Sequence, residues 1–287
     1  MGFLAAYIMR GRTQAIMVAS SLALLSLPLP PASIVSSAAV ALVTLRRGAS
    51  EGAYILLCAC LASAVLGALL VGDYQLTLFY TLFLWAPVWV ISVILREGRH
   101  LFLAIEIVVM IAMLAVTAAF LYQPDLAEVW KTWLNGLLEP MVIKANPEVP
   151  EEDIQRSLSV FYRYILTGLV AEIYVLSLLA GLFLARWWQA TLYNPGGFKK
   201  EYLALKGQKT LAIATIFIVA AAWFFSGIIA EICWNITVLL FVLYAFLGTV
   251  VLHCTFSSMN RKKILVPFLY ISMILIPHAM IPAAIIG

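Results

Sequence analysis

Charged residues are scarce in this chain of 287 residues. Asp, Glu, Lys and Arg make up 11% of it, whereas 64% of the residues are hydrophobic. Soluble domains are roughly 25% charged and roughly 45–50% apolar. A soluble fold has no interior large enough to hide so much apolar surface, so the composition excludes that class. It predicts an all-α protein, a polytopic bundle of transmembrane helices.

Residue patterns for catalysis, metal binding and nucleic-acid binding are also missing. The four Cys and three His do not occur at the spacings of a zinc site or a Ser/His/Asp triad. The sequence has no phosphate-binding Gly-rich loop and no basic patch with interleaved aromatic residues. We therefore expect no enzymatic activity, no catalytic residues, no metal, no cofactor and no nucleic-acid partner.

Long apolar runs fill most of the chain. A hydrocarbon core about 30 Å thick needs about 20 apolar residues per helix. The first two runs are short and are separated by Pro28, Pro30 and Pro31, which cannot continue a helix. They are expected to form two short spans or a re-entrant pair. We predict about eight to nine spans, or seven if the pair is re-entrant, in one transmembrane domain, residues 1–287. The runs are 14–29, 31–45, 53–71, 76–95, 101–122, 159–186, 209–230, 233–254 and 264–286.

Lys and Arg are distributed unevenly between the two sides of this predicted bundle. With a cytoplasmic N-terminus, 14 of the 18 basic residues fall in cytoplasmic segments, as the positive-inside rule requires. The other four lie in or beside the acidic segment 123–158, which is then extracytoplasmic. Its apolar positions recur at helical spacing, which predicts an amphipathic helix at the membrane interface with Trp130 and Trp133 at headgroup depth. A lid over an external cavity is the alternative.

Ionisable residues at membrane depth are costly and therefore require an explanation. Glu172 lies in the middle of its apolar run, and we expect a substrate or proton site there, with Tyr164 or Tyr174 nearby. The alternative is a protonated Glu172 bonded to a neighbouring helix. Arg163 lies nine residues earlier, roughly 13 Å along the helix axis, and is not expected to pair with it. Glu106 is a further candidate ligand-binding residue, although pairing with a boundary arginine is a simpler explanation.

The basic cytoplasmic loop 187–208 combines anchoring residues with a specified backbone shape. Trp and Lys side chains fit ordinary attachment to the inner leaflet. The Pro-Gly-Gly sequence predicts a sharp turn, followed by a short amphipathic helix over 198–206. A fixed turn indicates that a partner docks there. The candidate docking residues are Arg186, Trp187, Trp188, Asn194, Pro195, Gly196, Gly197 and Phe198, with Arg46 and Arg47 from an earlier turn.

Two stretches carry a resemblance to a known family. They are Arg186-Trp-Trp-Gln-Ala with the following Tyr193-Asn-Pro-Gly-Gly-Phe, and Ala39-Val-Ala-Leu-Val-Thr-Leu-Arg-Arg-Gly48. Together with the number of runs they resemble the DUF2232 (YybS-like) family of bacterial inner-membrane proteins. That family is distantly similar to the substrate-binding subunits of energy-coupling factor vitamin transporters and to the rod-shape subunit MreD. The resemblance implies a multi-pass protein of the bacterial inner (cytoplasmic) membrane.

Two functional hypotheses follow. The first is a transporter-like membrane subunit that binds a small molecule or a lipid within its bundle. The second is a non-transporting scaffold that docks envelope or other membrane proteins through the loop 186–208. The expected partners are the lipid bilayer and either another membrane protein or a second copy of the chain.

Overall fold

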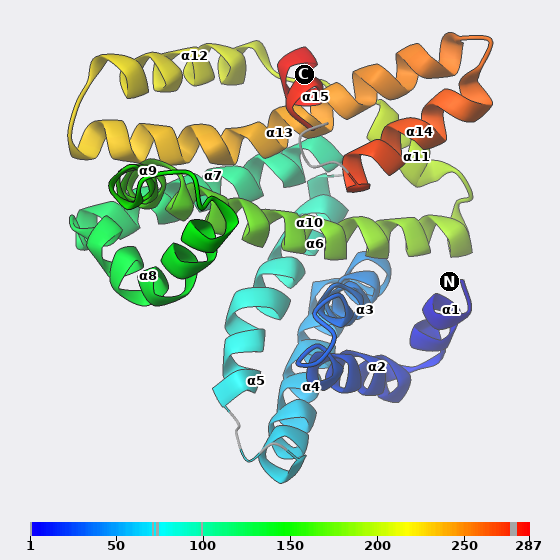
Figure 1. Cartoon of the computed structure of the whole chain (residues 1–287). Coiled ribbons are helices and arrows are strands. Elements are labelled where there is room, and N and C mark those ends of the chain that lie inside the picture. Colours follow the sequence, from blue (N-terminus) through cyan, green and yellow to red (C-terminus); the bar gives the residue numbers. More distant parts are fainter. Residues whose placement is uncertain (1, 71, 73–74, 99, 276–279) are drawn as a thin grey trace. The chain divides into compact units, whose positions relative to one another are not determined.

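The computed structural model describes residues 2–70, 72, 75–98, 100–275 and 280–287, and every regular element in this part of the chain is a helix (Figure 1). The all-α prediction is confirmed. The chain folds as two compact units. Unit 1 comprises Met1–Glu106 and Leu176–Leu205, and unit 2 comprises Ile107–Val175 and Lys206–Gly287. Whether the two units form the single transmembrane domain that the sequence predicts stays a prediction.

Among the described residues, five helices are long and apolar enough to cross a membrane, judged by length and composition. Their sides expose large apolar side chains such as Leu57, Leu61 and Leu114. Lipid favours such surfaces and water does not. The helices are consistent with a membrane protein, but the predicted count of eight to nine spans is not confirmed. The five segments are Ala49–Leu70, Thr77–Gly98, Leu101–Tyr122, Leu166–Tyr193 and Ile228–Ser258.

The remaining predicted runs form shorter or interrupted helices. Three of them form α2 (Arg12–Leu25), α3 (Ala32–Arg47) and α12 (Lys209–Phe224). The last run is divided between α14 (Lys262–Leu275) and α15 (Met280–Ile286), and residues 276–279 lie outside the described part. Short helices such as α2 and α3 are the reason why the count differs, because they lack the length of a full crossing.

Unit 1 is built around α3. Every residue from Ser36 to Leu45 is buried, because α3 packs against α2, α4 and α6. An apolar helix that is covered on all sides belongs to the interior of a fold. The proline-rich segment between α2 and α3 separates the two helices as predicted. The other elements of unit 1 are α1 (Gly2–Arg10), α4 (Ala49–Leu70), α5 (Gln75–Tyr80), η1 (Thr81–Trp85), α6 (Ala86–Gly98), the second part of α10 (Leu166–Tyr193) and α11 (Gly197–Leu203).

Unit 2 is built around α13 (Ile228–Ser258), which packs against α12, α14, α15 and α9 (Glu151–Tyr164). It also contains most of α7 (Leu101–Tyr122), α8 (Leu126–Ala145) and the first part of α10.

The predicted run 159–186 is not one helix. The chain breaks at Ile165, where α9 ends and α10 begins.

The apolar sides of α8 and α9 pack against each other as a hairpin (Figure 1). Leu158 and Tyr162 of α9 are buried in its core, and Trp130 of α8 packs against them. Burial, with a smaller contribution from the charge of Glu139, raises the pKa of the Tyr162 hydroxyl. Trp130 donates a hydrogen bond to Thr167 Oγ1 (2.9 Å). Of the predicted interfacial tryptophan pair, only Trp133 keeps the exposure that headgroup contact requires.

Candidate functional site

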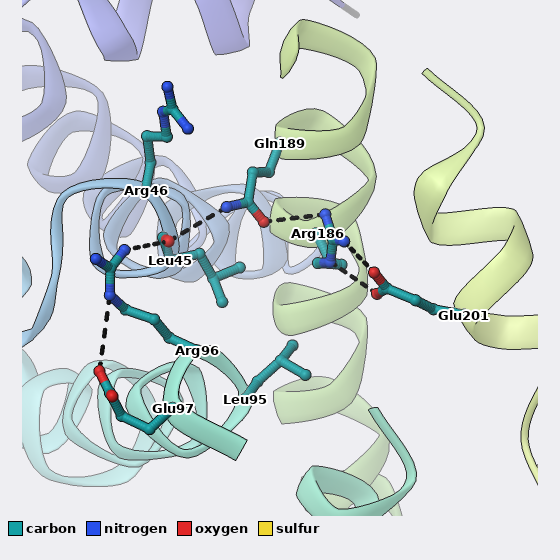
Figure 2. Close-up of a pocket in the computed structure, with 8 residues that line it drawn as sticks. All are labelled: Leu45, Arg46, Leu95, Arg96, Glu97, Arg186, Gln189 and Glu201. Carbon is teal, nitrogen blue, oxygen red and sulfur yellow. Dashed lines mark hydrogen bonds and ion pairs between the residues drawn. The ribbon is translucent and has the colours of Figure 1, made fainter. Parts of the chain in front are cut away.

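A polar cavity of about 510 Å³ lies in unit 1, where α3, α6 and α10 come together (Figure 2). Three arginines and two glutamates contribute to its lining, so the side chains carry one surplus positive charge at neutral pH. A surplus positive charge in a concave site favours an anion. The lining residues are Leu45, Arg46, Leu95, Arg96, Glu97, Arg186, Gln189 and Glu201.

The backbone carbonyl of Leu45 organises one side of the cavity. It belongs to the last turn of α3, where carbonyl groups lack partners within the helix. Arg96 Nη1 donates to it at 2.7 Å and Gln189 Nε2 donates to it at 3.2 Å. The positive charge of Arg96 also suits the negative end of the helix dipole. Arg96 and Gln189 therefore cap α3 and are held in fixed orientations at the cavity wall.

Arg186 forms the centre of the opposite side. Its guanidinium binds both carboxylate oxygens of Glu201, with Nε at 2.8 Å from Oε2. Its Nη1 donates to Gln189 Oε1 at 3.0 Å. The Arg186 side chain is 13% exposed and that of Glu201 is 34% exposed. A forked, partly buried ion pair of this kind fixes geometry more firmly than a surface pair.

The same ion pair draws the basic loop back onto its own helix. Gly196 adopts a positive φ of 83°, which glycine reaches without strain, so the predicted sharp turn is confirmed. A short helix follows the turn, α11 (Gly197–Leu203), which ends three residues before the predicted end at 206. Its Phe198 and Tyr202 rings lie 5.8 and 6.2 Å from that of Phe183 on α10, measured between centroids. The shape of the loop is therefore explained by packing within the chain.

Arg46 differs from the other two arginines of the cavity. Its Cζ lies 4.0 Å from the centroid of the Tyr193 ring, a cation–π contact. In the described part of the chain it forms no hydrogen bond or ion pair, and Figure 2 shows its guanidinium apart from the bonded groups. The neighbouring Arg47 instead donates from Nη2 to the carbonyl of Met9 at 2.8 Å.

The docking residues predicted from sequence have different environments. Arg46 and Arg186 come together in the cavity. Trp187 is partly exposed, and Asn194 and Pro195 are exposed outside the cavity. The interfacial prediction is wrong for Trp188, whose ring is fully buried.

The predicted ligand-binding residues do not line this cavity. Glu172 and Tyr174 are half-buried on α10, and Tyr164 lies at the end of α9. Arg163 lies 3.5 Å from Glu231 in an ion pair, which fits the prediction that it does not serve Glu172. The ligand-binding roles of Glu172, Tyr164, Tyr174 and Glu106 stay predictions.

Four polar residues of the cavity were not singled out from the sequence: Arg96, Glu97, Gln189 and Glu201. The sequence carries a signal for two of them, Gln189 and Glu201. Gln189 follows Arg186 by three residues, which places both on one face of a helix. Glu201 is the single acidic residue between positions 187 and 208, so it is the natural local partner for an arginine.

Among the described residues, no group of three or more His, Cys, Asp or Glu side chains could hold a metal ion. Comparisons with family models, curated proteins and solved structures gave no match to the chain. The resemblance to the DUF2232 family stays a prediction.

Proposed function

We propose that this chain is a multi-pass protein of the bacterial inner membrane that binds a small anionic ligand in the arginine-lined cavity of unit 1. The observation that carries the proposal is the state of Arg46, which lines the cavity without a carboxylate partner in the described part of the chain. A guanidinium presents a planar fork of donors that matches a phosphate or a carboxylate. In this proposal the guanidinium of Arg46 pairs with the negatively charged group of the ligand.

Arg186 and Arg96 have a supporting role in this proposal. Their positions are fixed by Glu201 and by the Leu45 carbonyl, so they present a preorganised electrostatic surface. Preorganisation lowers the entropy that binding would otherwise cost. The ligand's anionic group therefore meets a cavity whose wall is already in place.

We assign the cavity to the cytoplasmic side, because its arginines belong to segments that the positive-inside rule places there. A phosphate or carboxylate reaches this boundary from two sources, a soluble metabolite or a lipid headgroup. Both fit a transporter-like or lipid-binding membrane subunit. The scaffold hypothesis is second, since the apolar side of α11 packs on Phe183 and is not free to receive a partner.

The test compares Arg46→Gln with a matched control, Arg47→Gln. Arg47 is the next residue in the sequence, and its side chain does not line the cavity. Thermal unfolding is followed in detergent with inorganic phosphate or citrate. It is also followed in nanodiscs of phosphatidylcholine with and without phosphatidylglycerol. A ligand at about 100 times its Kd stabilises the folded state by about 2.7 kcal/mol.

We expect wild type and Arg47→Gln to be stabilised, and Arg46→Gln to lose most of the shift. A shift with soluble anions identifies a metabolite source, and one confined to phosphatidylglycerol identifies a headgroup. No shift in wild type under any condition, or an equal shift in Arg46→Gln, would overturn the proposal. Glu172→Gln in the same assay tests the separate prediction that Glu172 contacts a ligand.

A further inference from the structure

The outer side of α8 carries a stripe of three apolar side chains that the described chain leaves uncovered. Trp133, Leu137 and Met141 are 78%, 60% and 61% exposed. They follow one another at four-residue intervals and therefore lie along one side of a helix with about 3.6 residues per turn. The same geometry places Glu128, Thr132 and Glu139 on the opposite side of α8. α8 therefore has a second apolar side, in addition to the side that packs on α9.

The hairpin that carries this stripe is held close to the ends of two apolar helices. α7 ends at Tyr122 and α8 begins at Leu126, and four extended steps reach at most about 14 Å. α9 is joined to α10 through Ile165 alone. Both connections are too short for the hairpin to leave the boundary where the apolar part of α7 and α10 ends.

Specific bonds also fix the hairpin's base. The Asn235 side chain of α13 donates to the Arg163 carbonyl on α9 (3.0 Å) and accepts from the Gly168 N–H on α10 (2.7 Å). Trp130 of α8 donates to Thr167. Because these bonds cross from the hairpin to α10 and α13, the stripe keeps a defined orientation within unit 2.

We infer that the α8–α9 hairpin rests on the lipid bilayer, with Trp133, Leu137 and Met141 inserted at the interface. In the last turn of α7, which three residues separate from α8, Leu121 and Tyr122 are exposed as well. Tryptophan is enriched at the boundary between headgroups and acyl chains, and the exposed Glu128 and Thr132 on the opposite side of α8 then face water. The occupant of the stripe is lipid, and the inference is independent of the arginine-lined cavity.

Site-directed spin labelling of the whole chain in proteoliposomes tests the inference. Cysteine is introduced singly as Trp133→Cys, Leu137→Cys or Met141→Cys in a chain whose four native cysteines are replaced by serine. Matched controls are Glu128→Cys and Thr132→Cys, from the opposite side of the same helix. We expect the three stripe labels to collide more often with oxygen than with a water-soluble nickel chelate, and the two controls to show the reverse.

Two results would overturn the inference. Labels at the stripe that are as accessible to the nickel chelate as the controls would place the stripe in water. Dipolar broadening between labels of two copies would make it a protein–protein surface. A second measurement is made on the chain with its native cysteines in place. Lipids brominated near the headgroup quench tryptophan fluorescence, and this quenching should fall in Trp133→Phe. Equal quenching in wild type and Trp133→Phe would contradict lipid contact.

Discussion

Both ends of α10 are interruptions of the helical chain, and each is stabilised by different chemistry. At its beginning, in unit 2, the chain breaks at Ile165, and the carboxamide of Asn235 bonds to backbone groups on both sides of the break. At its end, in unit 1, the chain turns sharply, and the guanidinium of Arg186 binds the carboxylate of Glu201. At the first interruption the backbone groups are bound by a neutral amide, beside the Arg163–Glu231 ion pair, whereas at the second the ion pair itself closes the turn.

Burial explains the difference. Asn235 is fully buried, and a charge at that position would lose its hydration without full compensation. An amide supplies one acceptor and two donors without charge, which suits a break that exposes both a carbonyl and an N–H. The Arg186–Glu201 pair keeps partial solvent contact, so its desolvation costs less. The backbone groups at the beginning of α10 are therefore bound by a fully buried amide, whereas the partly solvated turn at its end is closed by an ion pair.

Replacing Asn235 with leucine should cause the largest loss of stability. The substitution keeps the branched shape of the side chain but leaves the Arg163 carbonyl and the Gly168 N–H without their bonds. Each orphaned group costs about 1–3 kcal/mol, so we expect the free energy of unfolding to fall by about 3 kcal/mol. Reversible unfolding in mixed detergent micelles measures the change.

Thr237→Val is the matched control for that experiment. Thr237 lies on the same helix, and among the described residues its hydroxyl bonds only to the Cys233 carbonyl one turn earlier, so it should lose less than about 1 kcal/mol. If Asn235→Leu were as mild as Thr237→Val, the amide would not stabilise the break and the comparison would fail.

A second, smaller loss is expected from Gly168→Ala. A Cβ at Gly168 would collide with the backbone of Asn235, and overpacking of this kind costs about 1–3 kcal/mol. Gly136→Ala is the control, because a Cβ there meets nothing within 4 Å. An exposed helical alanine gains about 0.5–1 kcal/mol over glycine. Opposite signs for the two variants in the same unfolding assay support the close approach of α10 and α13, and equal signs would contradict it.

The two interruptions also differ in how well the sequence predicts them. The turn before α11 follows from local chemistry. Pro195 restricts the backbone angle at its own position, and Gly196 and Gly197 permit positive φ. The break at Ile165 has no glycine or proline at the site, and the apolar run continues through it. Its stabilising partner, Asn235, is 70 residues further along the chain. A run of apolar residues therefore predicts helix and burial, but not where a distant side chain interrupts it.

The cavity itself was not predicted from the sequence. Arg46 and Arg186 were named as docking residues, because they lie in two basic turns assigned to the cytoplasmic side. Their convergence was not predicted, because it depends on the packing of α3 against α6 and α10. The capping of the Leu45 carbonyl by Arg96 and Gln189 joins three separate segments. Charge alone gives no signal for such a contact.

The smallest effect on stability is expected at the end of α10 in unit 1, where Arg186 and Glu201 pair. Because both side chains keep some exposure, solvent screens the pair, and we expect a coupling energy of about 1 kcal/mol. A double-mutant cycle with Arg186→Gln, Glu201→Gln and the double variant isolates this energy. Each single variant should also speed tryptic cleavage at the exposed Lys199 and Lys200, because α11 loses its ion pair to α10. A coupling energy of about 3 kcal/mol would equal the loss expected at Asn235 and would mean that the pair behaves as a buried one. The contrast between the buried beginning and the partly solvated end of α10 would then be wrong.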